Sequence, residues 1–230
     1  MRLAPERHAA RLLAALALAW TGLVFAQDSA KDINAPFVTN PDVLRWKGAL
    51  ENEDREVYAK RNEIVAAAGV KRGMAVADVG SGTGLFTRLF ARAVAPGGRV
   101  YAVDISQPLL DHVVQTAKAQ GLDNITAVLD SATDVKLPEA SVDLVYICDT
   151  YHHFEQPAEV LASIRKALRP GGKLVVIDFE RIPGVTPARL LHHVRLGKAD
   201  AIKEIEAAGF RFAGEKKLLR ENWFAVFQRP

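Results

Sequence analysis

Cysteine is nearly missing from this chain of 230 residues, since Cys148 is the single one and no disulfide can form within the chain. Because Cys148 ends an apolar stretch, we expect it to act as a small buried hydrophobic residue. A large charge excess is missing too, with 30 lysines and arginines against 27 aspartates and glutamates. Three of these basic residues and one acidic residue fall within the first 26, which leaves 27 against 26. This balance argues against nucleic acid as a partner.

The sequence also lacks an obvious membrane span. The N-terminal apolar run, Leu12–Ala26, has 15 residues, whereas a helix that crosses a bilayer needs roughly 20. The run follows a basic start and ends in the small residue Ala26, which is the pattern of a secretory signal peptide. We therefore expect cleavage before Gln27 and a periplasmic or secreted mature protein without a stable membrane span. The alternative is that the run remains as an N-terminal membrane anchor.

What is present is typical of a globular protein, with 49% hydrophobic and 25% charged residues. The length suits one well-buried domain and is short for two. Beyond residue 62, apolar strands alternate with helical segments, which predicts a parallel sheet covered by helices on both faces. We expect strands at 76–79, 99–104, 125–129, 142–148, 174–179, from 209 and at 223–227, and helices at 63–68, 85–94, 107–119, 157–168, 190–196 and 200–208.

The segment from Val76 to Gly84 is the most informative part of the chain. It is predicted to be a buried strand that ends in an acid, followed by a tight turn with three glycines and then by a helix. A turn without side chains lets a ligand lie on the backbone, and the helix N-terminus offers free N–H groups. The ligand should therefore be nucleotide-like. The dinucleotide fingerprint would place its third glycine at position 85, where this chain has Leu85.

Four acidic residues end or follow predicted strands: Asp78, Asp104, Asp130 and Asp149. Because ligands of open α/β sheets bind beyond the carboxyl ends of the strands, these acids are expected at one edge. Asp104 can accept hydrogen bonds from both hydroxyls of a ribose, as acids do in NAD-binding folds. A cluster of acids suits a ligand with cationic groups and would repel a pyrophosphate.

The spacing D-x-G-x-G-x-G, here Asp78 to Gly84, resembles the first motif of class I S-adenosylmethionine-dependent methyltransferases. The segment Arg169–Lys173, with its Pro-Gly-Gly, resembles the entry of this family to its fifth strand, and the match covers roughly residues 63–180. The resemblance implies an α/β fold, doubly wound around a mostly parallel seven-stranded sheet with a C-terminal antiparallel hairpin. It implies S-adenosylmethionine as cofactor, bound by Asp78, Gly80, Ser81, Gly82, Gly84, Asp104, Ile105, Asp130, Ser131, Ala132 and Asp149.

Residues 27–62 lie between the predicted signal peptide and the methyltransferase domain at 63–230. Within them, residues 42–61 have the apolar spacing of an amphipathic helix, and the simpler interpretation is a helix packed on the core. In the family, an N-terminal helix often closes over cofactor and substrate. Tyr58 and Arg61 are then candidates to face the methionine end of the cofactor, with Arg61 paired to its carboxylate.

Chemistry at the acceptor is expected from the segment after the strand 142–148. Tyr151, His152 and His153 follow this strand, where the family places groups that face the acceptor, and a histidine could take a proton at neutral pH. The alternative is that these histidines cap a turn or lie exposed. His192 and His193 lie in the segment that commonly covers the acceptor site. No metal site is predicted, because the two histidine pairs are far apart in sequence and no acid has ligand spacing.

The sequence thus predicts methyl transfer from S-adenosylmethionine to a small-molecule or lipid-like acceptor. Two alternatives belong to other classes. An NAD(P)-dependent oxidoreductase is disfavoured by Leu85 and by the predicted C-terminal hairpin. A non-catalytic protein that keeps the fold and the ligand pocket is the other alternative.

Overall fold

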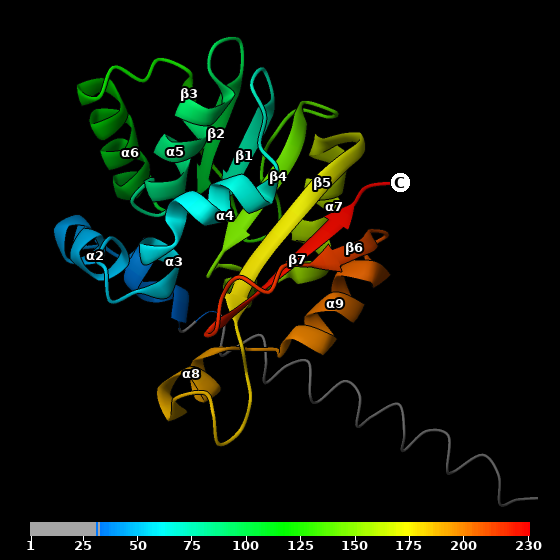
Figure 1. Cartoon of the computed structure of the whole chain (residues 1–230). Helices are drawn as coiled ribbons and strands as arrows, with labels where there is room; N and C mark the ends of the chain where they lie inside the picture. The colour runs from blue at the N-terminus through cyan, green and yellow to red at the C-terminus, as the bar shows by residue number, and fades with distance from the viewer. Residues whose placement is uncertain (1–30, 32) are drawn as a thin grey trace, which may run out of the picture.

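The computed structural model describes residue 31 and residues 33–230, so the predicted signal peptide lies outside the described residues. A seven-stranded sheet forms the centre of the fold, in the order β3-β2-β1-β4-β5-β7-β6. The first five strands pair in parallel, whereas β7 runs antiparallel to both β5 and β6 (Figure 1). The strands are β1 (Ala75–Val79), β2 (Arg99–Asp104), β3 (Ile125–Leu129), β4 (Val142–Cys148), β5 (Leu168–Phe179), β6 (Arg211–Glu215) and β7 (Asn222–Gln228).

Helices cover both faces of this sheet. On one face, α4 (Arg61–Ala68) and α5 (Leu85–Val94) pack on the strands through residues such as Ile64 and Phe90, and α6 (Gln107–Ala119) packs on Ala102. On the other face lie α7 (Pro157–Ala167) and α9 (Lys198–Ala207). Since both faces are covered, β1 is buried along its whole length, as is typical of a central parallel strand.

The architecture confirms the predicted Rossmann-like methyltransferase fold. The predicted bounds of α5, β2, α6, β3 and β4 agree with the structure. The antiparallel β7 is the feature that separates this topology from a dehydrogenase, in which the last strand would continue in parallel.

The expected single helix at 42–61 is wrong, because the segment is broken into three pieces. These are α2 (Val43–Leu50), α3 (Glu56–Ala59) and the start of α4. The side-chain amide of Asn52 donates to the carbonyls of Gly48 and Ala49, which satisfies the end of α2 and favours a turn there. A helical stretch at 33–38 precedes α2.

This N-terminal segment, residues 33–60, is fixed over the carboxyl edge of the sheet by buried polar contacts. The Glu51 carboxylate accepts two hydrogen bonds from Arg88 of α5, at 2.8 and 2.9 Å. The Glu56 carboxylate accepts from the backbone N–H groups of Arg220 and Glu221, just before β7. We call residues 33–60 the cap.

Among the described residues, no helix combines the length and the apolar character needed to cross a membrane.

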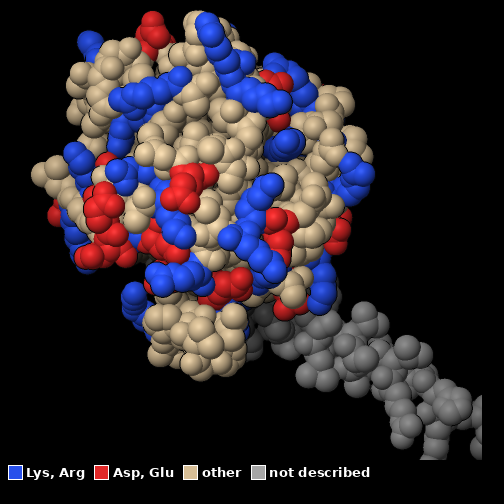
Figure 2. All heavy atoms as spheres, viewed as in Figure 1, with Lys and Arg blue, Asp and Glu red and all other residues tan. Residues whose placement is uncertain are grey.

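Basic and acidic side chains are interspersed on the molecular face in Figure 2, which agrees with the balanced charge of the sequence. The projection that carries α8 (Ala188–His193) is mostly uncharged in this view. Two apolar residues of the preceding loop, Ile182 and Val185, are 45% and 75% exposed.

Candidate active site

A cavity opens at the carboxyl ends of β1 to β4, between the glycine turn and the cap. Its wall combines backbone of the turn after β1 with the ends of β2 and β4 and the segment after β3. Apart from Gly84, the cofactor-binding residues predicted from the sequence all line it: Asp78, Gly80, Ser81, Gly82, Asp104, Ile105, Asp130, Ser131, Ala132 and Asp149. The fold therefore brings four separate sequence segments together at one site.

The three glycines of the turn have different roles, although all have positive φ (71°, 52° and 78°). A Cβ on Gly80 would overlap the side chain of Thr150, and a Cβ on Gly84 would lie 2.8 Å from Val113 of α6. Gly82 is open, because a Cβ there would meet only Leu50, at 3.5 Å. Gly80 and Gly84 thus allow close packing, and Gly82 presents bare backbone to the cavity.

Asp104 shapes the turn as well as the cavity. Its carboxylate accepts hydrogen bonds from the backbone N–H of Gly82 at 2.8 Å and of Ser106 at 2.9 Å. The side chain is buried, and this burial raises its pKa. Each carboxylate oxygen keeps lone pairs for further donors, such as the two hydroxyls of a ribose.

Two other acids of the cavity have strongly raised pKa values. Burial, together with the charge of Asp104, raises the pKa of Asp78 to about 7, although Asp78 accepts a 2.5 Å hydrogen bond from Thr87. Burial and the charge of Asp104 also raise the pKa of Asp130 to about 8. Oδ1 of Asp130 is buried and has no hydrogen-bond partner within the described part of the chain. These acids favour a ligand that brings donors or positive charge.

The arginine of the cap that lines the cavity is Arg55, not the predicted Arg61. The Arg55 guanidinium lies 2.5 Å from the Asp149 carboxylate, at the end of β4. Arg61 instead stacks over the ring of Tyr58 and pairs with Glu53 near the surface. The prediction failed because it assumed one continuous helix, whereas the turn after Leu50 changes which side chains face inward.

A second cavity adjoins the first and shares Phe37, Leu50, Arg55, Asp149 and His153 with it. Aromatic side chains form much of its wall, including Phe37, which stacks on Trp46 with ring centroids 4.2 Å apart. Phe179 of β5 also lines it. The second cavity is therefore suited to a flat or apolar molecule held next to the ligand of the first.

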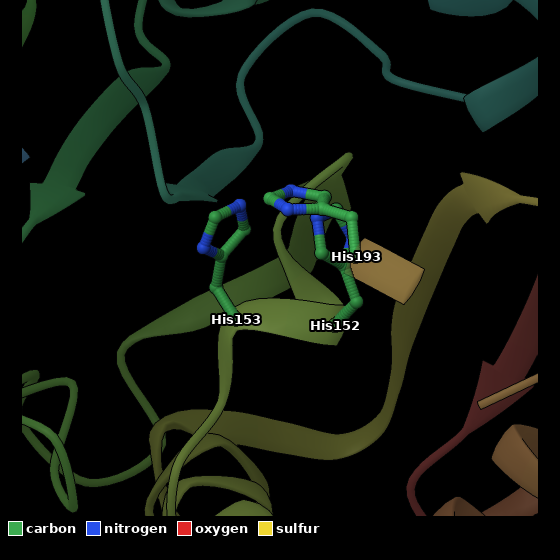
Figure 3. A group of neighbouring side chains, drawn as sticks. All are labelled: His152, His153 and His193. Atoms are coloured by element: carbon green, nitrogen blue, oxygen red, sulfur yellow. The ribbon is translucent and has the colours of Figure 1, made fainter. Parts of the chain in front are cut away.

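Three histidines meet at this second cavity: His152 and His153 from the short 3-10 helix η1 (Tyr151–His153), and His193 from α8 (Figure 3). Ring centroids of His193 lie 4.9 Å from His152 and 5.4 Å from His153. His192, the neighbour of His193, does not line this cavity. The structure thus brings His193, but not its neighbour His192, together with His152 and His153.

The first two histidines are held by different partners. Nδ1 of His152 lies 2.7 Å from Oδ1 of Asp178, and the backbone N–H of His152 donates to Oδ2 at 2.9 Å. Burial lowers the pKa of His152, but the charge and hydrogen bond of Asp178 outweigh it, so the pKa is raised. Nδ1 of His153 lies 2.8 Å from Oδ1 of Asn34, and burial lowers the pKa of His153 to about 2.

Tyr151 lines neither cavity, contrary to the prediction that it faces the acceptor. Its ring is packed in the core beside Phe154, and its hydroxyl donates a 2.5 Å hydrogen bond to Glu204 of α9. Burial raises the pKa of this hydroxyl.

Cys148 lines the first cavity, and burial raises the pKa of its thiol well above the ordinary value, which disfavours a reactive thiolate.

Besides Arg55, sequence reasoning missed Asp178 and Asn34. Asp178 lies near the end of β5, so the pattern that identified the other acids at strand ends could have found it. Asn34 lies before α2 in a segment with no chemical motif, and its role depends on a contact 119 positions along the chain.

Comparison with known proteins agrees with this arrangement. Residues 77–176 match the family described as "Methyltransferase domain". The chain is 34% identical over 119 residues to the ubiquinone/menaquinone biosynthesis C-methyltransferase UbiE of Hahella chejuensis, which covers 50% of this chain and 46% of that protein. The UbiE protein of Pectobacterium carotovorum is 29% identical over 158 residues, 66% of this chain and 62% of that protein.

The chain spans about half the length of most of these curated relatives. Among solved structures, a SAM-dependent methyltransferase from Aquifex aeolicus has a TM-score of 0.74 at 20% identity. The alignment covers 82% of this chain and 99% of that one, which shows a shared fold.

Proposed function

Since this chain carries a class I S-adenosylmethionine-dependent methyltransferase domain, we propose that it transfers a methyl group from S-adenosylmethionine to a small or lipid-like acceptor in the second cavity. The observation that carries the proposal is the junction of two cavities that differ in chemistry. One is built from bare backbone and acids, the other from aromatic rings and histidines, and they share a wall.

The residues of the first cavity fit the parts of S-adenosylmethionine. An adenine amino group would supply the donor that Oδ1 of Asp130 lacks among the described residues, and the ribose hydroxyls would bind Asp104. Gly82 would lie against the ligand. Asp78 would favour the ammonium group at the methionine end, and Arg55 would be the candidate partner for the carboxylate.

The reaction needs little covalent help from the protein. A nucleophilic atom of the acceptor attacks the methyl carbon, the carbon–sulfur bond breaks, and S-adenosylhomocysteine remains. Holding the two reactants in line can supply on the order of 7 to 11 kcal/mol of the acceleration. If the acceptor arrives protonated, Nε2 of His152 is our candidate base, because Asp178 holds the other ring nitrogen and stabilises the imidazolium that forms.

The walls of the second cavity support a flat, apolar acceptor, such as a hydroxylated aromatic ring with a lipid-like substituent. Phe37, Trp46 and Phe179 offer aromatic surface, and the histidines offer polar atoms at one side. The names of the relatives point the same way, since they are called C-methyltransferases of ubiquinone and menaquinone biosynthesis.

We further propose that the protein is exported, on the basis of the basic start and short apolar run of residues 1–26. N-terminal sequencing of the protein from an envelope fraction should give Gln27 as the first residue. An intact Met1 in the cytosol would contradict both cleavage and export. Export would also require a supply of S-adenosylmethionine outside the cytoplasm.

The proposed activity is tested first by ligand binding and then by turnover. Mass spectrometry of the purified protein should detect retained S-adenosylmethionine or S-adenosylhomocysteine, and calorimetry should show micromolar binding of S-adenosylhomocysteine. Binding of NADH with no response to S-adenosylhomocysteine would instead indicate an oxidoreductase. Binding without methyl transfer across a panel of hydroxylated aromatic acceptors would indicate the non-catalytic alternative.

A further inference from the structure

We propose that His152, His153 and His193 form a binding site for a divalent transition metal, zinc above others, on the wall of the second cavity. One ring nitrogen from each residue can be chosen so that all three lie within 4.8 Å of one another. The three rings come from η1 and α8 and lie together in Figure 3. Clustering of three imidazoles at a cavity was not expected from the sequence, where the two histidine pairs lie far apart.

The tautomer of His152 is fixed by its partner. Asp178 accepts the backbone N–H of His152 with one oxygen and faces Nδ1 with the other. An ionised carboxylate only accepts, so Nδ1 carries the hydrogen, and in the neutral ring that binds a metal Nε2 holds the lone pair. This Nε2 is buried and finds no hydrogen-bond partner in the part of the chain that the structure describes. A histidine that donates to a carboxylate and leaves the other nitrogen free is the arrangement of a metal ligand with an orienting partner.

The tautomer of His153 follows from Asn34 by the same reasoning. The Nδ2 group of Asn34 donates to the carbonyl of His153 and to Glu155, both at 3.0 Å. These two bonds orient the amide so that Oδ1 faces Nδ1 of His153, at 2.8 Å. Because that oxygen can only accept, Nδ1 of His153 is the donor and Nε2 has a free lone pair. In both of these adjacent histidines Nδ1 is therefore the donor, and two different acceptors impose it.

The charges around the cluster favour a cation. Asp178 and Asp149 are the acids next to the histidines, and Arg55 and Arg195 are the nearby bases. Both arginines are engaged elsewhere, Arg55 with Asp149 and Arg195 with Glu204. The charge of Asp178 is thus left to offset a bound cation.

Three imidazoles suit zinc and its neighbours in the first transition series better than magnesium or calcium, which prefer oxygen. Zinc sites with three protein ligands leave a fourth position for water or substrate. Here that position would face the second cavity. If the proposed methyl transfer is correct, an acceptor oxygen would occupy it, and the metal would lower the pKa of that hydroxyl so that solvent water, rather than His152, takes its proton. Metal binding itself does not depend on the methyl transfer.

The test uses the full-length protein without a histidine tag, stripped with a chelator and then titrated with Zn²⁺ by calorimetry and with Co²⁺ by visible absorption. We expect one equivalent to bind and an intense visible band typical of low-coordinate cobalt. His193→Ala should weaken zinc binding at least about 100-fold, and Asp178→Asn about 10- to 100-fold. His192→Ala is the matched control, because this neighbour lies outside the cluster and should leave affinity unchanged.

The variants must also keep their affinity for S-adenosylhomocysteine, because His193 does not line the first cavity; this shows that they are folded. No stoichiometric binding to the wild type, or equal binding by wild type and His193→Ala, would overturn the metal site. Binding of S-adenosylhomocysteine without zinc would reject this inference and leave the proposed function standing. Zinc binding without any S-adenosylhomocysteine binding would reject the proposed function and leave the metal site standing.

Discussion

Asp178 and His152 form a buried pair in which one carboxylate holds both the ring and the backbone of the histidine. Oδ1 lies 2.7 Å from the ring Nδ1, and Oδ2 accepts the backbone N–H at 2.9 Å. The pair joins β5 to η1, and its histidine lines the second cavity. The orientation of Nε2 is therefore set by a residue that makes two bonds at once.

Asp178→Asn should lower kcat while leaving the affinity for S-adenosylhomocysteine nearly unchanged. An amide has one accepting oxygen, so its NH₂ group would face one of the two N–H donors and turn the ring. We expect a loss of about 10²- to 10³-fold in kcat, within the usual range for a disturbed acid–base group. Steady-state kinetics and calorimetry check this. Unchanged turnover across the pH range would show that the pair is structural.

Substitution of two glycines of the same turn should separate binding from stability. Gly82→Ala places a methyl group in the open cavity, so S-adenosylhomocysteine should bind much more weakly, whereas the melting temperature of the free protein should fall only through the strain of the positive φ. Gly84→Ala forces a Cβ against Val113 and should lower the melting temperature further. Each change also carries roughly 1 to 2 kcal/mol of strain from the positive φ. Thermal unfolding with and without ligand tests both, and equal ligand shifts in the two variants would contradict the assignment.

The raised pKa values of Asp78 and Asp130, about 7 and about 8, predict how pH affects the free protein. Between the ordinary pKa of an aspartate, roughly 4, and these raised values, the folded state holds more protons than the unfolded state, so the free energy of unfolding should fall as pH rises. Chemical denaturation at about pH 5 and about pH 8.5 measures this fall in the free energy of unfolding, because most of the pH range in which it occurs lies between these two values. Asp130→Asn should reduce the slope, and a stability that rises over this range would contradict the direction of both shifts.

The same titration should act on ligand binding in the opposite sense. S-adenosylmethionine carries positive charge, and its adenine amino group needs an acceptor, so its affinity should increase as Asp130 ionises. We expect the affinity to increase about tenfold for each pH unit, in the pH range below the pKa of Asp130 in which binding releases one proton. Calorimetry of the Asp130→Asn variant should show a flatter dependence, because the substituted amide is matched in size but does not titrate.

Arg55 and Arg61 offer a matched pair of substitutions within and beside the cap. Arg55→Ala leaves Asp149 buried without its partner and should cost about 3 to 5 kcal/mol of stability. Arg61→Ala removes a contact with Glu53, whose side chain is 71% exposed, and should cost less than about 1 kcal/mol. Denaturant unfolding distinguishes the two. Addition of Asp149→Asn should recover part of the Arg55→Ala loss, because it removes the unpaired charge.

The sheet and the cofactor cavity could be predicted from the sequence because their signals are local. Apolar runs ending in or followed by an acid identified β2 and β4, and the spacing from Asp78 to Gly84 identified the turn. The parallel arrangement of the strands then brings Asp104 and Asp130 to one edge without further information. Asp104 and Asp130 accordingly line the first cavity, as predicted.

The acceptor side was harder to predict because it depends on how separate segments meet. Tyr151 and His152 are adjacent in sequence, but η1 turns the tyrosine into the core against α9 and the histidine towards Asp178. Likewise, helical periodicity over 42–61 could not reveal the turn after Leu50, which selects Arg55 for the cavity. His193 joins the other histidines only because the loop after β5 places α8 beside η1.

The contact between Asn34 and His153 limits how far the acceptor site can lie from the N-terminal apolar run. Asn34 follows Gln27 by seven positions, and a fully extended chain covers at most about 3.6 Å per residue, so these residues reach no more than about 25 Å. A protein that retained its apolar N-terminal run in a bilayer would thus be held with its acceptor cavity close to the lipid surface. Signal cleavage would then decide whether a lipophilic acceptor is collected from the membrane or must first diffuse through water.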